Sequence, residues 1–260
     1  MSAPLDSVTG VGTEMLDLKA IKNAGIPVYV NAGVNARSVA EHTLTLMLAC
    51  LKRLPQINSD THSGVWKKQL QGVSTHEFSG KTVALVGMGN IGRTVAEMLK
   101  PFNVNIIYTD VFRQSEEVEA RLGLTYVEGF ESLLPNADIL SFHCPLTDDN
   151  REILNCSTLA MMKDGAIVIN TARGKLIDPN ALYDAMIRGK LASAALDVHY
   201  EEPVSKEYKL AELENVILTP HIGGLSYEAF YAMMRNAVSN IVAFEKGEYE
   251  SIEKNKFQIL

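Results

Sequence analysis

The stretch KTVALVGMGNIGRTVAEMLK, residues 81–100, decides the fold. Its first half is a short apolar run, typical of a strand that is buried on both faces of a sheet. Its second half has helical spacing and stops before Pro101, a residue that interrupts helices. Between the halves lies GMGNIG, residues 87–92, whose glycines allow a tight turn and a close approach of the backbone to a ligand. The stretch therefore predicts a strand, a glycine turn and a helix N-terminus in succession.

The same alternation of apolar runs and helical patterns continues for more than a hundred residues. Further strands are expected at 104–108, 124–127, 139–142, 166–169, 192–196 and 216–218, in addition to 83–86. Helices are expected at 91–100 and at 179–187, the second of which opens with proline and stops before glycine. Repeated strand–helix units of this kind predict an α/β fold with a doubly wound parallel sheet, the Rossmann type.

The two flanks of this region have a different pattern. Residues 26–30 predict one more strand, and residues 37–54 predict a helix that is apolar on nearly every face, as expected for burial against other elements or another subunit. Residues 58–75, around the single tryptophan, are polar and poorly patterned, and we expect a loop or arm there. Residues 226–244 have apolar side chains at i, i+3, i+4 and i+7, which predicts an amphipathic helix whose apolar stripe packs in the core.

Composition excludes several classes of partner. The chain has 260 residues, is 47% hydrophobic and carries a formal charge of −7, so it has no basic stripe for nucleic acid or anionic lipid. No apolar run approaches the roughly 20 residues of a membrane span, and the first residues do not resemble a signal peptide, so we expect a cytoplasmic protein. Cys50, Cys144 and Cys156 are odd in number and lack CxxC spacing, which argues against disulfides and structural zinc, and no metal site is expected.

The glycine motif lies in the context that predicts a dinucleotide site. Backbone amides at the start of the helix would face the pyrophosphate at the positive end of the helix dipole. The residues expected at this turn are Gly87, Gly89, Asn90, Ile91 and Gly92. Asp110 ends the next strand, where a carboxylate can accept hydrogen bonds from the adenosine ribose and repel a 2′-phosphate. NAD is therefore favoured, while Arg113 nearby leaves NADP as an alternative.

Three further motifs follow predicted strands: NTARG at 170–174, DVHYEEP at 197–203 and TPHIGG at 219–224. Open α/β sheets bind ligands at this carboxyl edge. Arg173 could hold a substrate carboxylate, or simply form a surface ion pair. His221 suits proton transfer to a carbonyl oxygen, with Glu202 as the partner that orients it and favours its charged form; the alternative is a structural buried histidine.

Together these motifs resemble the D-isomer-specific 2-hydroxyacid dehydrogenases. The likeness runs from VGTEMLDL at 11–18 through VAEH at 39–42, GMGNIG, HCPLT at 143–147 and NTARG to PHIGG at 220–224. It implies NAD-dependent hydride transfer between nicotinamide and a small D-2-hydroxy or 2-keto acid, 3-phosphoglycerate among the candidates. The catalytic residues implied are Arg173, Glu202 and His221. The resemblance also implies substrate contacts from Val11, Gly12 and Arg173, a nicotinamide contact from Asp197, and cofactor contacts from Cys144, Pro145, Asn150, Thr171, Ala172, Gly223 and Gly224.

The resemblance further implies how the chain is divided. Residues 1–33 are expected to form part of a flavodoxin-like substrate domain, residues 34–222 the NAD-binding domain, and residues 223–260 a helix that returns to the substrate domain. Because the chain starts close to VGTEMLDL, we expect a shortened substrate lobe. A homodimer through the 37–54 helix and the 58–75 arm is expected. Two alternatives to an enzyme stay open: an NAD-binding regulatory or partner-binding dimer without turnover, and an inactive fragment.

Overall fold

The computed structural model describes residues 6–8, 16–26, 28–248 and 257–258. Its contacts divide the chain into two units: residues 39–223, and residues 1–38 together with 224–260. Val11 and Gly12, the backbone groups expected to bind substrate, lie outside the described residues.

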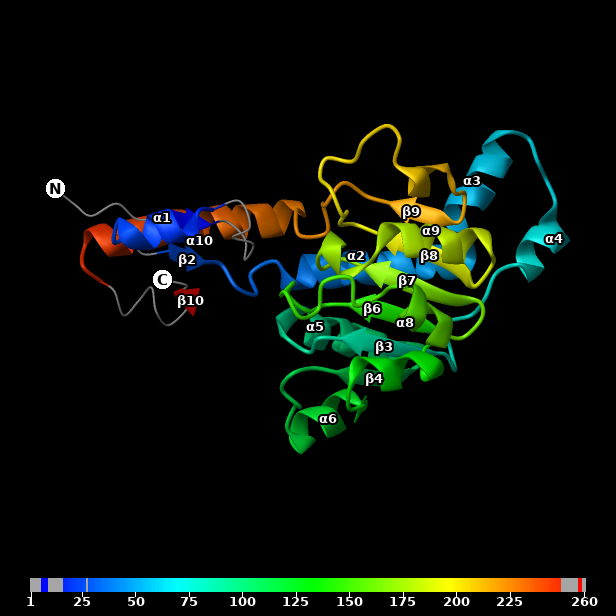
Figure 1. The fold of residues 1–260 in the computed structure, drawn as a ribbon, viewed down its shortest axis with the longest axis horizontal. Helices are drawn as coiled ribbons and strands as arrows, with labels where there is room; N and C mark the ends of the chain where they lie inside the picture. Colours follow the sequence, from blue (N-terminus) through cyan, green and yellow to red (C-terminus); the bar gives the residue numbers. More distant parts are fainter. Residues whose placement is uncertain (1–5, 9–15, 27, 249–256, 259–260) are drawn as a thin grey trace. The chain divides into compact units, whose positions relative to one another are not determined.

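The 39–223 unit is built on a parallel sheet of seven strands, shown in the right half of Figure 1. The strand order is β5-β4-β3-β6-β7-β8-β9, and every neighbouring pair is parallel. The bounds are β3 Thr82–Val86, β4 Asn105–Thr109, β5 Leu124–Tyr126, β6 Ile139–Phe142, β7 Ala166–Asn170, β8 Leu191–Leu196 and β9 Val216–Leu218. The predicted doubly wound α/β fold is confirmed, and the order reverses between β3 and β6.

Helices cover both faces of this sheet. Their bounds are α2 Ala36–Lys52, α3 Leu54–His62, α4 Lys68–Val73, α5 Asn90–Leu99, α6 Glu116–Leu122, α7 Phe130–Leu133, α8 Cys156–Met161 and α9 Pro179–Ile187, with short 3₁₀ helices at Lys100–Phe102, Leu134–Asn136, Gly174–Leu176 and Lys209–Glu212. Apolar residues of α2, α5 and α6 pack with Val83 and Leu85 on one face. Residues of α7, α8 and α9 pack with Ala84 and Val86 on the other. Alternate residues of one strand thus enter two cores, which explains why the strand is apolar throughout.

Of the two alternatives for residues 58–75, a loop or an arm, the loop was wrong, because most of this segment is helical. α2 ends at Lys52, Arg53 adopts a left-handed conformation with φ +49°, and α3 starts at once with proline in its first turn. α4 follows a short connection that contains Trp66. Neither α3 nor α4 has a buried residue. A helix without a buried face has no periodic apolar pattern, so the sequence gives little sign of it.

In its described residues, the second unit contains a three-stranded sheet and the helices α1 (Leu18–Asn23) and α10 (Tyr227–Glu245). The sheet order is β1 (Asp6–Val8), β2 (Val28–Val30) and β10 (Phe257–Gln258), with β1 parallel and β10 antiparallel to β2. Tyr29 of β2 is buried against Ala243 of α10. The predicted strand and long helix are therefore both present.

The predicted burial of the apolar stripe on α10 was wrong. The buried residues of this helix are Ala229, Met233, Ala237, Asn240 and Ala243. The larger apolar side chains are exposed within the described structure: Tyr227, Phe230, Tyr231, Val238, Ile241 and Val242. The helix packs through a mostly small-residue face, so the larger apolar residues of the periodic pattern point away from that contact. No helix of the described residues combines the length and apolar character that a membrane crossing requires.

Candidate active site

The glycine turn lies at the carboxyl end of β3, next to the loop that follows β6. Gly87 has φ +99°, and a Cβ placed on it would lie 2.7 Å from the backbone nitrogen of Cys144, so no side chain fits. A Cβ on Gly92 would overlap the carbonyl oxygen of Gly87, which keeps the start of α5 close to the strand. A Cβ on Gly89 would meet no described atom within 4 Å. The turn is thus closed towards the sheet and open on the side where a phosphate would approach.

The N-terminus of α5 is available to an anion. The helix begins at Asn90 after Gly89, and no side chain of the described residues caps it. Asn90 is exposed and Ile91 is half-buried. Uncapped amides at a helix N-terminus bind phosphate groups through their N–H donors and the helix dipole. This turn, placed at the point where the strand order reverses, fits a dinucleotide.

Asp110 follows β4 and holds the glycine turn from the side. Its Oδ2 accepts a hydrogen bond from the Met88 amide, and its Oδ1 accepts one from the Phe112 amide at 3.1 Å. A carboxylate has about four acceptor positions, so each oxygen can accept one more hydrogen bond. The remaining positions are sufficient for the two hydroxyls of a ribose.

The loop after β6 is braced by a side-chain amide. Asn150 Nδ2 donates to the Pro145 carbonyl at 2.8 Å, and Asn150 Oδ1 accepts from the Thr147 amide at 2.7 Å. Burial raises the pKa of the Cys144 thiol to about 11, so the thiol is protonated at neutral pH. Burial also lowers the pKa of His143 to about 3, which keeps that imidazole neutral. Cys144 therefore suits the wall of a site better than the role of a nucleophile.

The loop after β7 carries Thr171, Ala172 and Arg173. Asn170, the last residue of β7, accepts from the Ala172 amide at 3.0 Å and donates to the Arg173 carbonyl at 2.9 Å. The Thr43 hydroxyl donates to the Val39 carbonyl at 2.8 Å, so in the 2.9 Å contact between the Thr171 and Thr43 hydroxyls, Thr171 is the donor. The Arg173 guanidinium donates to the Ala172 carbonyl at 2.8 Å. This loop is fixed by its own side chains and by α2.

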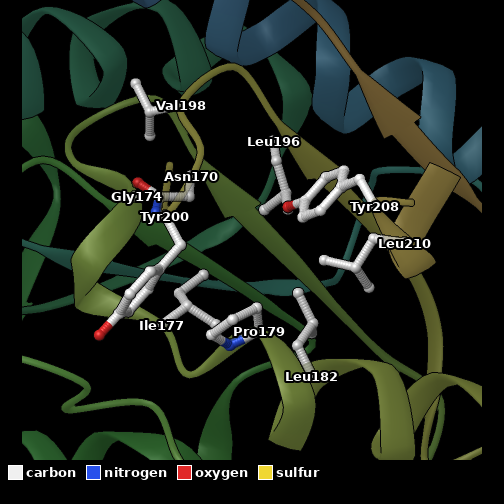
Figure 2. Close-up of a pocket in the computed structure, with 10 residues that line it drawn as sticks. All are labelled: Asn170, Gly174, Ile177, Pro179, Leu182, Leu196, Val198, Tyr200, Tyr208 and Leu210. Carbon is white, nitrogen blue, oxygen red and sulfur yellow. The ribbon is translucent and has the colours of Figure 1, made fainter. Parts of the chain in front are cut away.

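The loop after β7 touches the loop after β8. A Cβ on Gly174 would overlap the backbone carbonyl of His199, so the two backbones are in direct contact. A small, largely apolar pocket lies beside this contact (Figure 2). Its lining residues are Asn170, Gly174, Ile177, Pro179, Leu182, Leu196, Val198, Tyr200, Tyr208 and Leu210. None of the predicted site residues lines it, and we assign it no ligand.

Glu202 and His221 form a hydrogen-bonded pair. His221 Nδ1 lies 2.8 Å from Glu202 Oε2, and Glu202 Oε1 accepts from the His199 amide at 2.8 Å. Both carboxylate oxygens are thus engaged, which fixes the glutamate. Because a carboxylate favours the proton on the nitrogen that faces it, Nδ1 is the donor and Nε2 is left for another partner. The side chains are 51% and 37% exposed for His221 and Glu202, so the pair is reachable by a ligand.

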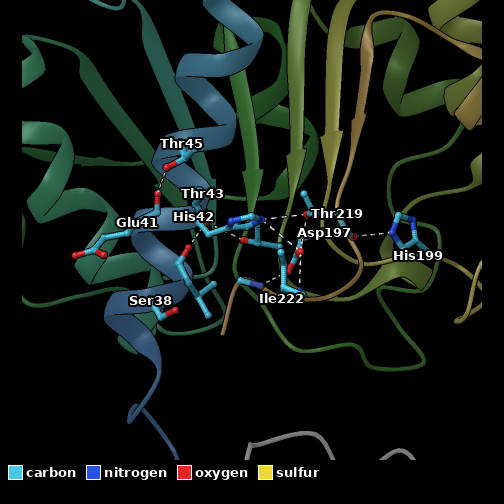
Figure 3. A network of polar contacts seen from close by, with 12 residues as sticks. Ser38, Glu41, His42, Thr43, Thr45, Asp197, His199, Thr219 and Ile222 are labelled. Atoms are coloured by element: carbon cyan, nitrogen blue, oxygen red, sulfur yellow. Dashed lines mark hydrogen bonds and ion pairs between the residues drawn. The ribbon is translucent and has the colours of Figure 1, made fainter. Parts of the chain in front are cut away.

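Asp197 fixes the backbone that carries His221. Figure 3 shows its contacts with His42, Thr219 and Ile222. Its Oδ1 accepts from the Thr219 hydroxyl at 2.6 Å and from the Ile222 amide at 2.9 Å, and its Oδ2 accepts from the Gly223 amide at 2.8 Å. Its backbone carbonyl accepts from the His221 amide at 2.8 Å. Burial raises the pKa of this carboxyl, but these hydrogen bonds together with His42 outweigh it and lower the pKa to about 2. Asp197, expected to contact nicotinamide, is largely occupied by this loop.

Two histidines that the sequence analysis did not select belong to the same network. His42 Nε2 lies 3.0 Å from the Thr219 hydroxyl and 3.4 Å from Asp197 Oδ1. His199 Nε2 lies 2.9 Å from the Thr219 carbonyl, and its ring packs edge-on against Tyr208. The sequence signal for both was weak: His42 is one of several polar residues on α2, and His199 lies inside a motif selected for Glu202.

Hydrogen bonds connect four of the predicted site residues. Asp197, Glu202, His221 and Gly223 share one hydrogen-bond network, and Arg173 lies in the loop that touches it through Gly174. Gly224 belongs to the other unit. Among the described residues, no group of three histidine, cysteine, aspartate or glutamate side chains is arranged to hold a metal ion.

The fold and the glycine turn define a dinucleotide-binding protein of the Rossmann type. The sequence profile of the D-isomer specific 2-hydroxyacid dehydrogenase NAD-binding domain matches residues 44–223. The chain therefore belongs to the D-isomer specific 2-hydroxyacid dehydrogenase family, and its cofactor is NAD.

Individual relatives agree with this assignment. The hydroxypyruvate reductase of Thermotoga maritima is 41% identical over 223 residues, which cover 85% of this chain and 70% of that protein. The D-3-phosphoglycerate dehydrogenase of Archaeoglobus fulgidus is 36% identical over 259 residues; the match covers 96% of this chain but only 48% of the relative, so the chain spans about half of its length. The structure of D-lactate dehydrogenase from Aquifex aeolicus complexed with NAD and lactic acid superposes with a TM-score of 0.88 at 31% identity, covering 97% of this chain and 79% of that one.

Proposed function

We propose that this chain is an NAD-dependent oxidoreductase acting between a small D-2-hydroxy acid and the corresponding 2-keto acid. In the reducing direction, one keto acid, one NADH and one proton give one hydroxy acid and one NAD⁺. The nicotinamide supplies or accepts the hydride. The chain must then supply a proton at the keto oxygen, a cation for the carboxylate and a fixed geometry for both.

The Glu202–His221 pair carries the proposal. With Nδ1 donating to Glu202 at 2.8 Å, Nε2 is the ring nitrogen of His221 left for a substrate, and it can pass a proton to the keto oxygen as that oxygen gains negative charge. In the oxidising direction the same nitrogen takes the proton back. A histidine on the surface without a chemical role does not require a carboxylate partner. Here the carboxylate of Glu202 is itself positioned by a second hydrogen bond, from the His199 amide. A histidine oriented by a carboxylate is the arrangement that acid–base catalysis uses, with the substrate as the third partner.

Arg173 is proposed to bind the substrate carboxylate. A guanidinium can pair with a carboxylate through two parallel hydrogen bonds, which fixes the plane of the acid as well as its position. Arg173 stands at the carboxyl end of β7, in a loop held by Asn170 on one side and in contact with the His199 backbone on the other. Val11 and Gly12 stay a prediction as further carboxylate contacts.

A spectrophotometric screen tests the proposal. NADH oxidation is followed with hydroxypyruvate, glyoxylate, pyruvate and phosphohydroxypyruvate, for the unmodified chain and for His221→Ala. We expect turnover with at least one keto acid, and a loss of about 100-fold or more in kcat for His221→Ala with nearly unchanged NADH affinity, because acid–base catalysis typically contributes that much. His76→Ala, an exposed histidine outside the network, is the matched control and should keep full activity. Equal loss of NADH binding and turnover in His221→Ala would contradict the assigned role.

The same screen separates the two alternatives. Tight NADH binding without turnover on any keto acid would favour a regulatory or partner-binding protein whose state follows dinucleotide occupancy. Absence of NADH binding would favour an inactive fragment. An NADH-dependent rise in melting temperature distinguishes these outcomes, because a ligand that binds only the folded state raises its stability by mass action.

We also propose a homodimer through α2 and the α3–α4 arm, in the cytoplasm. The arm exposes Leu54, Trp66, Leu70 and Val73, which are 57% to 79% exposed and are the kind of side chains that protein interfaces bury. Cys50, Cys144 and Cys156 are unpaired thiols, which fits a reducing compartment. Sedimentation should give twice the chain mass, and Trp66→Asp should shift it towards the monomer. A monomer in the unmodified chain would overturn the dimer.

A further inference from the structure

Beyond the phosphate-binding turn, one cluster of charged and aromatic residues surrounds Arg113. The guanidinium donates to Glu119 through two bonds, Nε to Oε1 and Nη2 to Oε2, both at 2.9 Å. It also stacks over the ring of Tyr126, 5.2 Å from the centroid. The Tyr108 hydroxyl donates to the same Glu119 oxygen at 2.6 Å. Arg113 therefore has its charge compensated and its plane fixed.

The backbone around Arg113 is held on both sides. The Phe112 amide donates to Asp110 Oδ1 at 3.1 Å, and the Gln114 amide donates to the Tyr108 hydroxyl at 2.9 Å. These two bonds hold the backbone, so the position of the Arg113 side chain is set by its own contacts. That side chain is three residues from Asp110, the carboxylate proposed for the adenosine ribose, and it is 57% exposed.

Glu119 is the group that decides where this side chain lies. It stands on α6, is only 12% exposed, and receives hydrogen bonds from both Arg113 and Tyr108. These bonds lower the pKa of Glu119 to about 2, so it is ionised throughout the physiological range. An arginine close to the ribose-binding carboxylate is the residue type that accommodates a 2′-phosphate in NADP-binding Rossmann domains. Here the same residue type is present, but its fork is engaged by a carboxylate.

We propose that Glu119 is a cofactor-specificity residue: by pairing with Arg113 and holding it against Tyr126, it keeps the chain selective for NAD over NADP. This inference rests on the proposed placement of the adenosine ribose at Asp110. Glu119 acts through Arg113 and not by contact with the dinucleotide. It removes from the ribose site the cation that a 2′-phosphate would need, because a guanidinium already paired bidentately gains little from a second anion.

The test is a calorimetric titration with NADH and with NADPH, which measures affinity independently of turnover. Glu119→Gln keeps the shape and an acceptor for Tyr108 but removes the charge that holds Arg113. We expect the NADPH affinity to rise about tenfold relative to the NADH affinity, as one released charge-assisted contact to a phosphate allows. An unchanged affinity ratio overturns the proposal.

Three further variants separate the pairing from simple charge removal. Glu117→Gln removes an exposed carboxylate from the same helix and should leave the ratio unchanged. In the double variant Glu119→Gln with Arg113→Gln, the gain should disappear, and a gain that survives overturns the proposal. Arg113→Gln alone should leave NADPH affinity nearly unchanged, because the arginine is already engaged.

A separate variant, Asp110→Ala, tests the placement of the ribose and should weaken NADH binding; if it does not, the ribose assignment and this inference fail together. Binding without turnover would overturn only the proposed reaction.

Discussion

Replacing Asp197 by asparagine should destabilise the 39–223 unit measurably. The carboxylate accepts from the Thr219 hydroxyl and from the Ile222 and Gly223 amides at 2.6 to 2.9 Å. Asparagine has one oxygen, so its NH₂ group would face one of these donors. The pKa of Asp197 lies at about 2 against an ordinary 3.8, and the ionised form therefore contributes about 2 kcal/mol to folding. With one buried donor left unpaired, we expect a total loss of about 2–4 kcal/mol at neutral pH.

The pH dependence of this loss has a definite sign. Because the pKa of Asp197 is lowered in the folded state, its contribution is complete above the unfolded pKa near 3.8 and is lost as the pH falls towards 2. Asparagine cannot titrate, so the difference between the two chains should shrink below about pH 4. Urea unfolding followed by circular dichroism, from pH 7 down to pH 3, measures this.

Asp148→Asn, on an exposed loop, is the control for the Asp197 experiment. It should change the free energy of unfolding by no more than about 0.5 kcal/mol. Two outcomes would refute the reasoning: an Asp197→Asn chain as stable as the unmodified one at neutral pH, or a difference between them that stays constant as the pH falls through the window.

Three other perturbations have defined outcomes. Gly174→Ala should lower the free energy of unfolding by about 1–3 kcal/mol in the same urea assay, because the added Cβ would overlap the His199 carbonyl. A Gly174→Ala chain with full stability would contradict this close contact. His199→Phe keeps the edge contact with Tyr208 but loses the hydrogen bond to the Thr219 carbonyl, which helps to position the loop that carries His221. We expect kcat to fall about tenfold with an unchanged KM for NADH. A fall in NADH affinity alone would count against this positioning role. Iodoacetamide at pH 8 should label exposed Cys156 well before Cys144, whose pKa is about 11; mass spectrometry showing equal labelling would contradict the burial.

The central strands β3, β6, β7 and β8 were predictable because they are buried at nearly every position, on both faces of the sheet. Such a strand is apolar at most positions, and a run of this kind is visible without knowledge of its neighbours. β6 and β9 were predicted with their observed bounds, and the remaining strands of this sheet were predicted within one residue at each end. Helices α3 and α4 were missed for the opposite reason, since they bury no residue and need no apolar pattern.

The helical spacing of the apolar residues on α10 could not by itself predict which face of the helix is buried. The helical spacing was real, but it marked the larger apolar residues such as Phe230 and Ile241, which are exposed in the described structure. The face that packs carries mainly small residues, including Ala229 and Ala237. A periodic stripe shows that a helix has two unlike faces. Which face meets the sheet depends on how closely the helix can approach, and that is set by residues distant in the chain.

The sequence motifs identified the loops of the candidate site but not the contacts between them. Glu202 and His221 were paired correctly from the chemistry that each residue type offers. Asp197 as a nicotinamide contact stays a prediction; the sequence did not show that its carboxylate also binds Thr219 and the two amides that follow His221. His42 is separated from Thr219 by 177 residues, and no local pattern could show that α2 would bring it there.

The conformation of His221 explains why this network surrounds the proposed base. His221 has φ +57°, in the left-handed region, which costs a non-glycine residue about 1 kcal/mol or more and persists only where the surroundings hold it. Its amide donates to the Asp197 carbonyl, and the next two amides donate to the Asp197 carboxylate. One residue at the end of β8 therefore fixes the backbone of the histidine, while Glu202, five residues later, fixes its ring. A single sheet edge thus determines both the position and the tautomer of the base, and a change at Asp197 should reach the proton transfer without any contact to substrate.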